Sequence, residues 1–313
     1  MTKLNQHFLQ TKAWADFQEA EGNKVFHEKG ENFEYYAILK STSLGKYLFL
    51  PYGPALADKK ALKNALTSLK KLAAEQNAIF IRVEPTVFFK ETEMKKLGFK
   101  KAHHIEPENS WFIDLTQSEE DILGAMESRK VRYYRNFAKK GMSIRTTHDP
   151  EEIKILYKLY TEVAANDNFQ TFDEKYLKNQ MKFPFSTLYV VDLEEEGKKV
   201  PIAAALMYDK DDTCYYAHTG ADYEHRKYNA GIILLIKMIL DAKANGRKFF
   251  DFWGVTTSED PKHPWYGFSK FKMSFGGKLL TFTGTYDLPV NKSKYRLYSL
   301  LRPINKLKRK LHK

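Results

Sequence analysis

The chain has 313 residues, of which 43% are hydrophobic and 14% aromatic, so its composition is that of a folded globular protein and not of a disordered one. Its formal net charge of +12 implies an anionic partner, which could be a nucleic acid, a phosphorylated small molecule or a membrane surface. The single cysteine, Cys214, excludes an intrachain disulfide, and no apolar run reaches the roughly 18 residues of a membrane span.

Strand and helix patterns alternate through the first half of the chain. Leucines recur at helical spacing over 59–76, with lysines on the opposite side, which is typical of an amphipathic helix. The other expected elements are a short helix at 14–17, strands at 33–40, 46–50, 78–83 and 111–115, and a helix at 91–97. This alternation predicts a mixed α/β sheet.

A basic and aromatic segment follows at 129–141. Just before it, Thr116 to Glu119 form a capping box that predicts a helix over 119–126. Within the segment, basic residues are interleaved with Tyr133, Tyr134 and Phe137, a mixture that suits a polyphosphate or the end of a single-stranded RNA. The candidate RNA-binding residues are Arg132, Arg135, Lys139 and Lys140. The alternative is a solvated amphipathic helix.

The second half predicts another α/β unit, with no flexible linker before it. The expected elements are helices at 150–165 and 174–182, strands at 187–193, 200–208 and 213–219, and a helix at 232–244. A strand meander, a turn and a helix in this order resemble the GNAT acyltransferases. In that family the turn holds a pyrophosphate at the helix N-terminus. Here Arg226, Asn229 and Gly231 occupy the motif positions; Asn229 replaces a glycine, which disfavours coenzyme A and is compatible with a different diphosphate held by Arg226.

The stretch 249–291 is the most distinctive part of the chain. An apolar strand pattern ends at Gly254 and opens into a polar loop, and loops at strand ends are where α/β proteins place ligand pockets. Lys270 and Lys272 then lie among three phenylalanines, so one ammonium is expected near apolar surface. The alternative is a phenylalanine-faced helix or strand with two solvated lysines.

The C-terminal tail, 292–313, is strongly basic, with tyrosines and leucines at near-helical intervals. Such a helix can lie on an anionic membrane or follow RNA phosphates. The alternative is a closing helix that packs on the second domain and frays at its end. No signal-peptide pattern opens the chain, so we expect a cytoplasmic protein, with the inner face of the cell membrane as the site of any peripheral contact.

Eight stretches along the chain carry a family resemblance through their order and spacing. They are FLQTKAWADF, YLFLPYGPAL, FIRVEP, SWFIDLTQSEEDILGAM, KVRYYRNFAKKGMSIR, FDFWGV, GFSKFKMSFGG and GTYDLPVNKSKYRLY. Together they resemble the Fem-type (FemABX) aminoacyltransferases, which build peptidoglycan interpeptide bridges. The resemblance covers nearly the whole chain.

This resemblance implies an α/β fold of two tandem GNAT-like domains. We expect them at 1–148 and 149–313, with the C-terminal segment as a candidate to complete the first, precursor-side domain. Between 150 and 201 there is no pair of long heptad runs, so the short form without a coiled-coil arm is expected.

The family transfers an amino acid from aminoacyl-tRNA to a stem-peptide amino group of a peptidoglycan precursor, either lipid II or UDP-MurNAc-pentapeptide. Aminoacyl-tRNA is then a co-substrate, and neither a cofactor nor a metal is expected.

The resemblance also suggests roles for individual residues. Lys272 matches the family's lysine before Phe-Gly-Gly and is expected to stabilise the oxyanion and the ester. Asp114 is a candidate proton acceptor for the incoming amine, with a helix-capping carboxylate as its alternative. Arg226 is expected at the precursor's diphosphate. The other expected substrate-binding residues are Tyr215, Tyr216, Tyr228, Asn229, Trp14, Phe271 and Trp253, and the basic segment at 129–141 becomes the expected tRNA site.

Two other functions stay open on the sequence. One is an aminoacyl-tRNA–protein transferase, whose acceptor is a protein N-terminus. The other is a non-catalytic module that binds RNA or a membrane through its basic segments.

Overall fold

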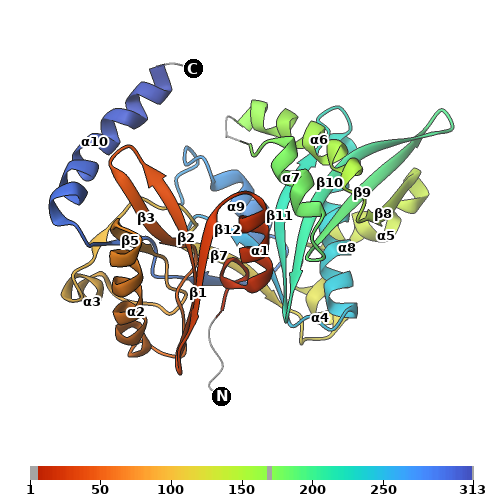
Figure 1. Cartoon of the computed structure of the whole chain (residues 1–313). Coiled ribbons are helices and arrows are strands. Elements are labelled where there is room, and N and C mark those ends of the chain that lie inside the picture. Colours follow the sequence, from red (N-terminus) through yellow and green to blue (C-terminus); the bar gives the residue numbers. More distant parts are fainter. Residues whose placement is uncertain (1–5, 168–170, 312–313) are drawn as a thin grey trace. The chain divides into compact units, whose positions relative to one another are not determined.

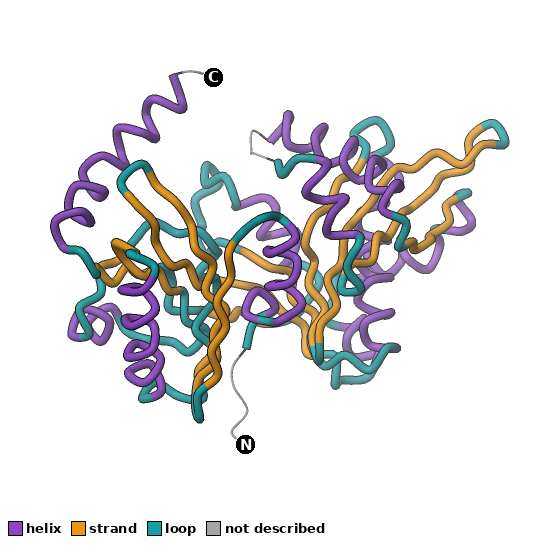
Figure 2. Tube along the Cα trace, viewed as in Figure 1, coloured by secondary structure: helices purple, strands orange, loops and turns teal. Residues whose placement is uncertain are grey.

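Two seven-stranded sheets, each with its own helices, form the framework of the fold (Figures 1 and 2). The computed structural model describes residues 6–167 and 171–311, and for 166–167 and 302–311 it describes the backbone only. The contacts divide the chain into two units. The first unit comprises Met1–Glu108 and Thr281–Lys313, and the second unit comprises Asn109–Leu280.

The first unit is built on a sheet in the order β1-β2-β3-β5-β14-β6, with β4 paired to β2. Its strands are β1 (Lys24–Lys29), β2 (Phe33–Thr42), β3 (Gly45–Leu50), β4 (Ala55–Leu56), β5 (Ala78–Val83), β6 (Lys100–Lys101) and β14 (Tyr286–Pro289). Its helices are η1 (Phe8–Gln10), α1 (Lys12–Ala20), α2 (Ala61–Glu75), α3 (Glu91–Lys96) and α10 (Lys292–Leu311). The predicted leucine repeat forms α2, whose Leu62, Leu66 and Leu69 are buried in the core of this unit.

The second unit is built on a sheet in the order β13-β7-β12-β11-β10-β9-β8. Its strands are β7 (Asn109–Asp114), β8 (Met142–Thr147), β9 (Ser186–Glu195), β10 (Lys198–Lys210), β11 (Thr213–Ala221), β12 (Phe249–Gly254) and β13 (Lys278–Thr281). Its helices are α4 (Glu119–Gly124), α5 (Ser128–Asn136), η2 (Ala138–Lys140), η3 (Pro150–Glu152), α6 (Ile153–Asp167), α7 (Glu174–Met181), η4 (Arg226–Tyr228), α8 (Ala230–Ala244) and α9 (Tyr266–Met273).

The two sheets share one topology, but the last strand of each has a different place in the sequence. In the second sheet it precedes the meander, and in the first it follows the whole second unit. In each, an antiparallel meander leads through a helix to a parallel strand, β3 to β5 and β11 to β12, and an antiparallel strand pairs with the far side. That last strand is β7 in the second sheet and β14 in the first. The domain boundary expected at 148 is therefore corrected to 108. Both β7 and β8 belong to the second sheet, whereas β14 belongs to the first.

A buried ion pair fixes β14 in the first unit. Arg82 on β5 donates two hydrogen bonds of 2.7 Å to the carboxylate of Asp287, and both side chains are almost fully buried. Tyr295 at the start of α10 donates to the same carboxylate at 3.1 Å and packs on Phe80. The described part of the tail therefore packs on the first unit and not on the second domain, while the side chains of 302–313 lie outside the described residues.

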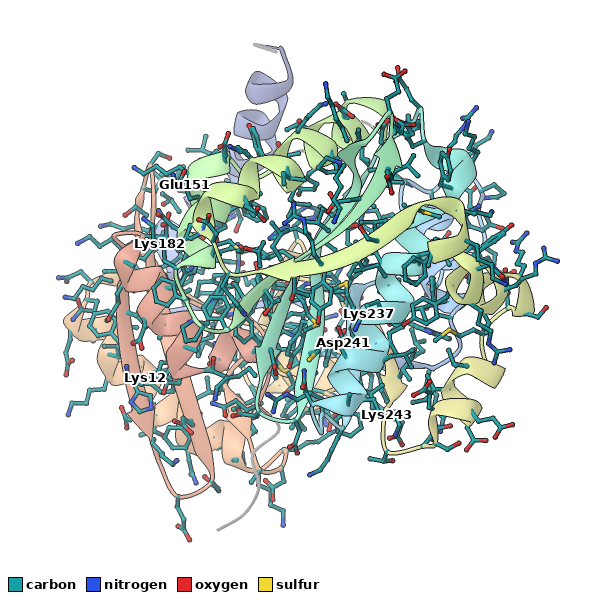
Figure 3. All side chains as sticks on the ribbon, turned by 90° about the vertical axis from the view of Figure 1, so that its right-hand side faces the viewer. Lys12, Glu151, Lys182, Lys237, Asp241 and Lys243 are labelled. Atoms are coloured by element: carbon teal, nitrogen blue, oxygen red, sulfur yellow. The ribbon has the colours of Figure 1, made fainter. Side chains whose placement is uncertain are left out.

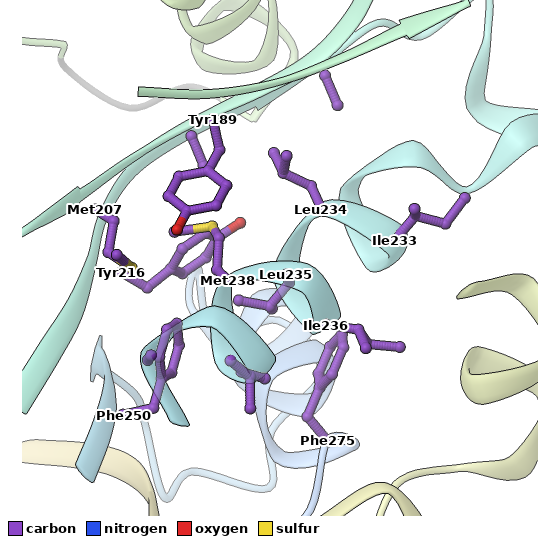
Figure 4. Packing of buried hydrophobic residues seen from close by; sticks show 14 of the residues in the cluster. Tyr189, Met207, Tyr216, Ile233, Leu234, Leu235, Ile236, Met238, Phe250 and Phe275 are labelled. Carbon is purple, nitrogen blue, oxygen red and sulfur yellow. The ribbon is translucent and has the colours of Figure 1, made fainter. Parts of the chain in front are cut away.

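The core of the second unit lies between its sheet and α8 (Figure 4). Apolar side chains of α8 meet Tyr189, Met207, Tyr216 and Phe250 from the facing strands. α8 also carries an ion pair of 2.5 Å between the half-buried Lys237 and Asp241, one helical turn apart (Figure 3).

Two further helices, α6 and α7, contact the second sheet through β9, β10 and β11. Gly220 on β11 permits the close approach of α6, since a Cβ at this position would lie 2.5 Å from the backbone carbon of Leu159. Within the described residues α6 and α7 contact each other, and no long helical arm is inserted between β8 and β9. No helix in the described ranges is both long and apolar enough to span a membrane.

Candidate active site

The parallel strands β11 and β12 pair only over the first three residues of each. They pair from Thr213 with Phe249 to Tyr215 with Asp251, and their register ends there although both strands continue. Beyond this pair the facing backbone groups of the two strands are not bonded to each other, and they need partners from side chains, water or a ligand. We call this opening in the second sheet the fork.

Lys272 reaches the fork from α9. Its Nζ donates a hydrogen bond of 2.8 Å to the carbonyl of Gly254, the last residue of β12, and lies 5.0 Å from the ring centre of Phe268. Burial lowers the pKa of Lys272 to about 7, and the nearby Asp251 carboxylate opposes part of that fall. A lysine with this pKa is present at neutral pH both as an ammonium, which can donate to an oxyanion, and as a free amine.

Asp251 holds the end of β12 in an unusual shape. The register of β12 with β7 shifts between Asp251 and Gly254, and Trp253 adopts a left-handed backbone conformation with φ of 64°. The Asp251 carboxylate accepts a hydrogen bond of 2.7 Å from the Trp253 amide and another from the Ser110 hydroxyl. Because such a bulge re-aims the groups around it, these bonds fix the direction of the Gly254 carbonyl that meets Lys272.

Asp251 lies on the opposite side of the sheet from the α8 core. Its neighbours Phe250 and Phe252 both point into that core, and side chains alternate along a strand. Only 6% of Asp251 is exposed, and burial raises its pKa, although the bonds from Ser110 and Trp253 and the charge of Lys272 act against the rise. A buried carboxylate and a half-buried amine thus flank the end of β12.

Aromatic side chains surround this arrangement. The Trp253 ring lies 5.7 Å from that of Tyr215 and 6.2 Å from that of Tyr208, measured between centroids. The Tyr208 hydroxyl is 3.1 Å from Nε2 of His218, whose pKa burial lowers to about 4. Tyr215 and Trp253 therefore adjoin each other near the end of β12 that Lys272 reaches, and Tyr208 joins them to His218.

The corresponding strands of the first unit do not leave such an opening. Past the last pair of β3 and β5, Leu50 with Val83, the amide of Glu84 donates to the carbonyl of Gly53 at 2.9 Å. The buried Gln10 side chain donates to the carbonyl of Pro51 at 2.9 Å and fills the space beside Gly53. Among the described residues, the fork of the second unit is thus the better place for a reaction.

Asp114 is not part of this site. It lies at the other end of β7, opposite Phe249, whereas Ser110 pairs with Gly254 beside Lys272. Four strand residues span roughly 13 Å. Asp114 instead accepts hydrogen bonds from the hydroxyl and amide of Thr116, which lower its pKa and stabilise the turn before α4. The carboxylate that interacts with Lys272 is Asp251; Asp114 stabilises the turn before α4, whose N-cap is Ser118.

A hollow of about 220 Å³ lies at the Asp114 end of β7, away from Lys272. It is lined by Ile113, Asp114, Gln117, Ile122, Ala125, Phe275, Gly277 and Lys278. Its charged groups, Asp114 and Lys278, attract each other. The candidate site is at the fork instead, where the Lys272 amine bonds the end of β12 and the buried Asp251 carboxylate holds the bulge.

Tyr216 and Trp14 are core residues. Tyr216 points into the α8 core with 6% of its surface exposed, and burial raises its pKa to about 12 (Figure 4). Trp14 packs between Phe8 and Phe17 in the first unit, at centroid distances of 5.5 and 5.0 Å. Their motif positions are explained by packing, which corrects the expectation that both line a substrate pocket.

The turn before α8 is exposed and basic. Arg226 is exposed, and Asn229 adopts a left-handed conformation with φ of 56° at the helix N-cap. The Asn229 side chain donates to the carbonyl of Lys227 at 3.1 Å and does not cap the helix. The half-buried Tyr228 packs against the core, and Nζ of Lys227 lies 5.3 Å from the centre of its ring.

The basic segment presents its charges outward and its aromatics inward. Arg132, Arg135, Lys139 and Lys140 are all exposed on α5 and η2. Tyr133, Tyr134 and Phe137 pack against the core of the second unit. Packing leaves these rings only partly exposed, so the groups that this segment presents fully to solvent are its charges.

Phe271 belongs to a packed aromatic and cationic group near the lysine. Its ring lies 5.1 Å from that of Phe275 and 5.6 Å from Nζ of the buried Lys130. Sequence reasoning missed Lys130, Ser110 and Asp251, since each reads as an ordinary member of its helix or strand. The signal available for Asp251 was a lone carboxylate inside the apolar run FFDFW.

Comparison with known proteins gives a consistent result. The model of the FemAB family matches residues 1–104 and 191–303, which is most of the chain. A lipid II:glycine glycyltransferase of Staphylococcus haemolyticus (strain JCSC1435) is 21% identical over 324 residues, covering 79% of this chain and 77% of the relative.

Solved structures agree on the fold. A crystal structure of FemX superposes with a TM-score of 0.83 at 19% identity, covering 94% of each chain. A tandem GNAT protein from the clavulanic acid biosynthesis pathway gives a TM-score of 0.53 at 10% identity, covering 89% of this chain and 94% of that one. The expected architecture of two GNAT-like units is confirmed.

Proposed function

The chain belongs to the FemAB family and is an aminoacyltransferase, and we propose that it moves an aminoacyl group from aminoacyl-tRNA to a stem-peptide amino group of a peptidoglycan precursor. The observation that carries the proposal is Lys272, held at the fork with a lowered pKa. The matching curated relatives are named lipid II:glycine glycyltransferases, which supports a precursor of peptidoglycan as the acceptor.

The chemistry is aminolysis of an activated ester. The amine nitrogen attacks the ester carbonyl, negative charge develops on the carbonyl oxygen, and the ribose oxygen of the RNA leaves. The ammonium form of Lys272 donates to that oxygen, and because the lysine is half-buried the interaction is stronger than in solution. The substrates themselves supply the activated bond, and the proposal includes no cofactor beyond aminoacyl-tRNA.

Anionic partners are assigned to the exposed basic groups. Arg226, in the turn before α8, is proposed for the diphosphate of the precursor, because a guanidinium binds phosphate oxygens in pairs. The exposed residues Arg132, Arg135, Lys139 and Lys140 are proposed for tRNA phosphates. The basic start of α10 is proposed to contact an anionic membrane, which would favour a lipid-linked acceptor.

The test is transfer of radiolabelled amino acids from a mixed pool of charged tRNA onto lipid II and onto UDP-MurNAc-pentapeptide. Wild type is compared with Lys272→Ala, and Lys270→Ala serves as the matched control because Lys270 lies on the same helix but is exposed. We expect label on one precursor, lost with Lys272→Ala and kept with Lys270→Ala.

Three other outcomes are informative. Label that persists in Lys272→Ala would remove this lysine from the reaction. Label on peptides with a free N-terminus, and on neither precursor, would identify an aminoacyl-tRNA–protein transferase. Binding of tRNA without any transfer would identify a binding module.

A further inference from the structure

The two oxygens of the Asp251 carboxylate have different surroundings. Oδ1 accepts the hydrogen bonds from the Ser110 hydroxyl and the Trp253 amide. Oδ2 accepts no hydrogen bond from the described residues. Some of its surface is accessible, because it does not belong to the fully buried polar atoms without a partner. Asp251, of which only 6% is exposed, thus has one carboxylate oxygen without a hydrogen bond from the described residues.

Lys272 interacts electrostatically with Asp251 without forming an ion pair with it. The charge of each side chain shifts the other's pKa. Within the described ranges they form no ion pair of 4.0 Å or less, because Nζ is bonded to the Gly254 carbonyl instead. An acceptor and a donor therefore face the same fork while each remains available to a third group.

We propose that Asp251 is a catalytic residue, whose Oδ2 accepts a proton from the primary amine that attacks the ester at the fork. The inference rests on the proposed function and adds the group that receives the proton, which the Lys272 assignment leaves open. A primary amine fits this position because it offers N–H donors to a carboxylate, and a carboxylate recognises that amine in both protonation states.

The step balances in atoms and electrons. The nitrogen lone pair forms the new C–N bond, and the π electrons of the carbonyl move to its oxygen, where Lys272 donates a hydrogen bond. Asp251 Oδ2 takes one proton from the positively charged nitrogen. The C–O bond to the ribose then breaks, the carbonyl reforms, and the proton passes from Asp251 to the leaving oxygen. The products are an amide and an alcohol, and the carboxylate is regenerated.

Asp251 also has a structural role, which the test must separate from the chemical one. Asp251→Asn suits this purpose, because its amide oxygen can still accept from Ser110 and Trp253 while an NH₂ group replaces Oδ2. The bulge that aims the Gly254 carbonyl is then kept and only the proton acceptor is lost. Ser110→Ala does the reverse, because it removes one bond to the bulge and leaves both carboxylate oxygens.

Steady-state transfer is measured with both variants and wild type on whichever precursor accepts label. We expect Asp251→Asn to lose about 10²–10⁴-fold in kcat, as for other general bases, with KM changed by less than about three-fold. We expect Ser110→Ala to lose less than about ten-fold. Equal losses in the two variants, or an Asp251→Asn enzyme within about three-fold of wild type, would overturn the inference and leave the proposed function standing.

A second measurement does not depend on transfer. In protein labelled with ¹³C at aspartate carboxyls, the resonance missing from Asp251→Asn is assigned to Asp251. We expect Nα-acetyl-lysine amide, which carries a primary amine, to shift this resonance, and Nα-acetyl-norleucine amide to leave it in place. If wild type transfers to no acceptor, the proposed function fails, and a resonance that does not respond to the amine then overturns this inference as well.

Discussion

Replacing Lys272 by methionine should stabilise the protein at neutral pH. Burial holds the pKa of Lys272 near 7 instead of 10.5, and one pKa unit is worth about 1.4 kcal/mol, so enclosing this amine costs at most about 5 kcal/mol. Methionine fills a similar volume without that penalty but removes the hydrogen bond to Gly254, worth about 1 kcal/mol. The expected net gain in unfolding free energy at pH 7 is about 2–4 kcal/mol.

The stability gain of Lys272→Met is expected to depend on pH. The unfolded chain keeps the Lys272 proton up to about pH 10.5, whereas the folded protein releases it above about pH 7. Between these values the unfolded state binds more protons, so the wild type gains stability from this group as pH rises. The advantage of Lys272→Met should therefore be complete below about pH 7 and disappear toward pH 10.

The assay is urea unfolding at pH 6.5, 8 and 9.5, followed by tryptophan fluorescence, with Lys270→Met as the matched control. The quantity compared is the difference between variant and wild type at each pH, which cancels the titration of other groups. Two results would refute the view that Lys272 is enclosed as an amine of low pKa. One is a gain of the same size at all three pH values, and the other is a wild type that is more stable than Lys272→Met at pH 6.5.

Three further predictions concern the scaffold and the charged surface. Asp287→Ala leaves the buried guanidinium of Arg82 without its partner and should cost about 3–5 kcal/mol of unfolding free energy, measured by urea titration with Arg82→Lys for comparison. Gly220→Ala places a methyl group 2.5 Å from the backbone of α6 and should cost about 1–3 kcal/mol or more; a melting temperature equal to wild type would contradict that close approach. Reversing Arg132 and Arg135 to glutamate should weaken tRNA binding and reduce the slope of log affinity against log salt by about 0.9 for each phosphate that the variant no longer neutralises, so an unchanged slope would place the tRNA elsewhere.

Periodicity was sufficient for most of the regular structure. The leucine repeat predicted over 59–76 is α2, and the apolar run predicted over 232–244 is α8 with two more residues at its start. These helices could be predicted because the burial of one face of a helix leaves a local periodic pattern in the sequence. The C-terminal segment was a candidate to complete the first domain, but the strand β14 within it was not predicted, because its pairing with β5 joins residues about 200 positions apart and leaves no local pattern.

Only part of the site was predicted, again because contacts between distant segments leave no local pattern in the sequence. Lys272 could be found because it sits in a recognisable motif, but its carboxylate partner could not, since proximity at the fork depends on how β7, β12 and α9 assemble. Asp114 was chosen as the only carboxylate in the SWFIDL strand; sequence does not show which end of that antiparallel strand meets Gly254. Strand alternation would have separated Tyr215 from Tyr216, because adjacent strand residues face opposite sides.

The different places of β7 and β14 in the sequence set an order in which the protein can be completed during synthesis. Once residue 280 has left the ribosome, every strand of the second sheet up to its edge strand β13 is available, with Asn109–Leu280 contiguous in sequence. The first sheet still lacks β14 at that moment, and Arg82 has no carboxylate to receive it until Asp287 emerges. Although domains generally form from the N-terminus during translation, here the later half of the chain can close first. The earlier half needs the segment Thr281–Lys313 before its sheet is complete.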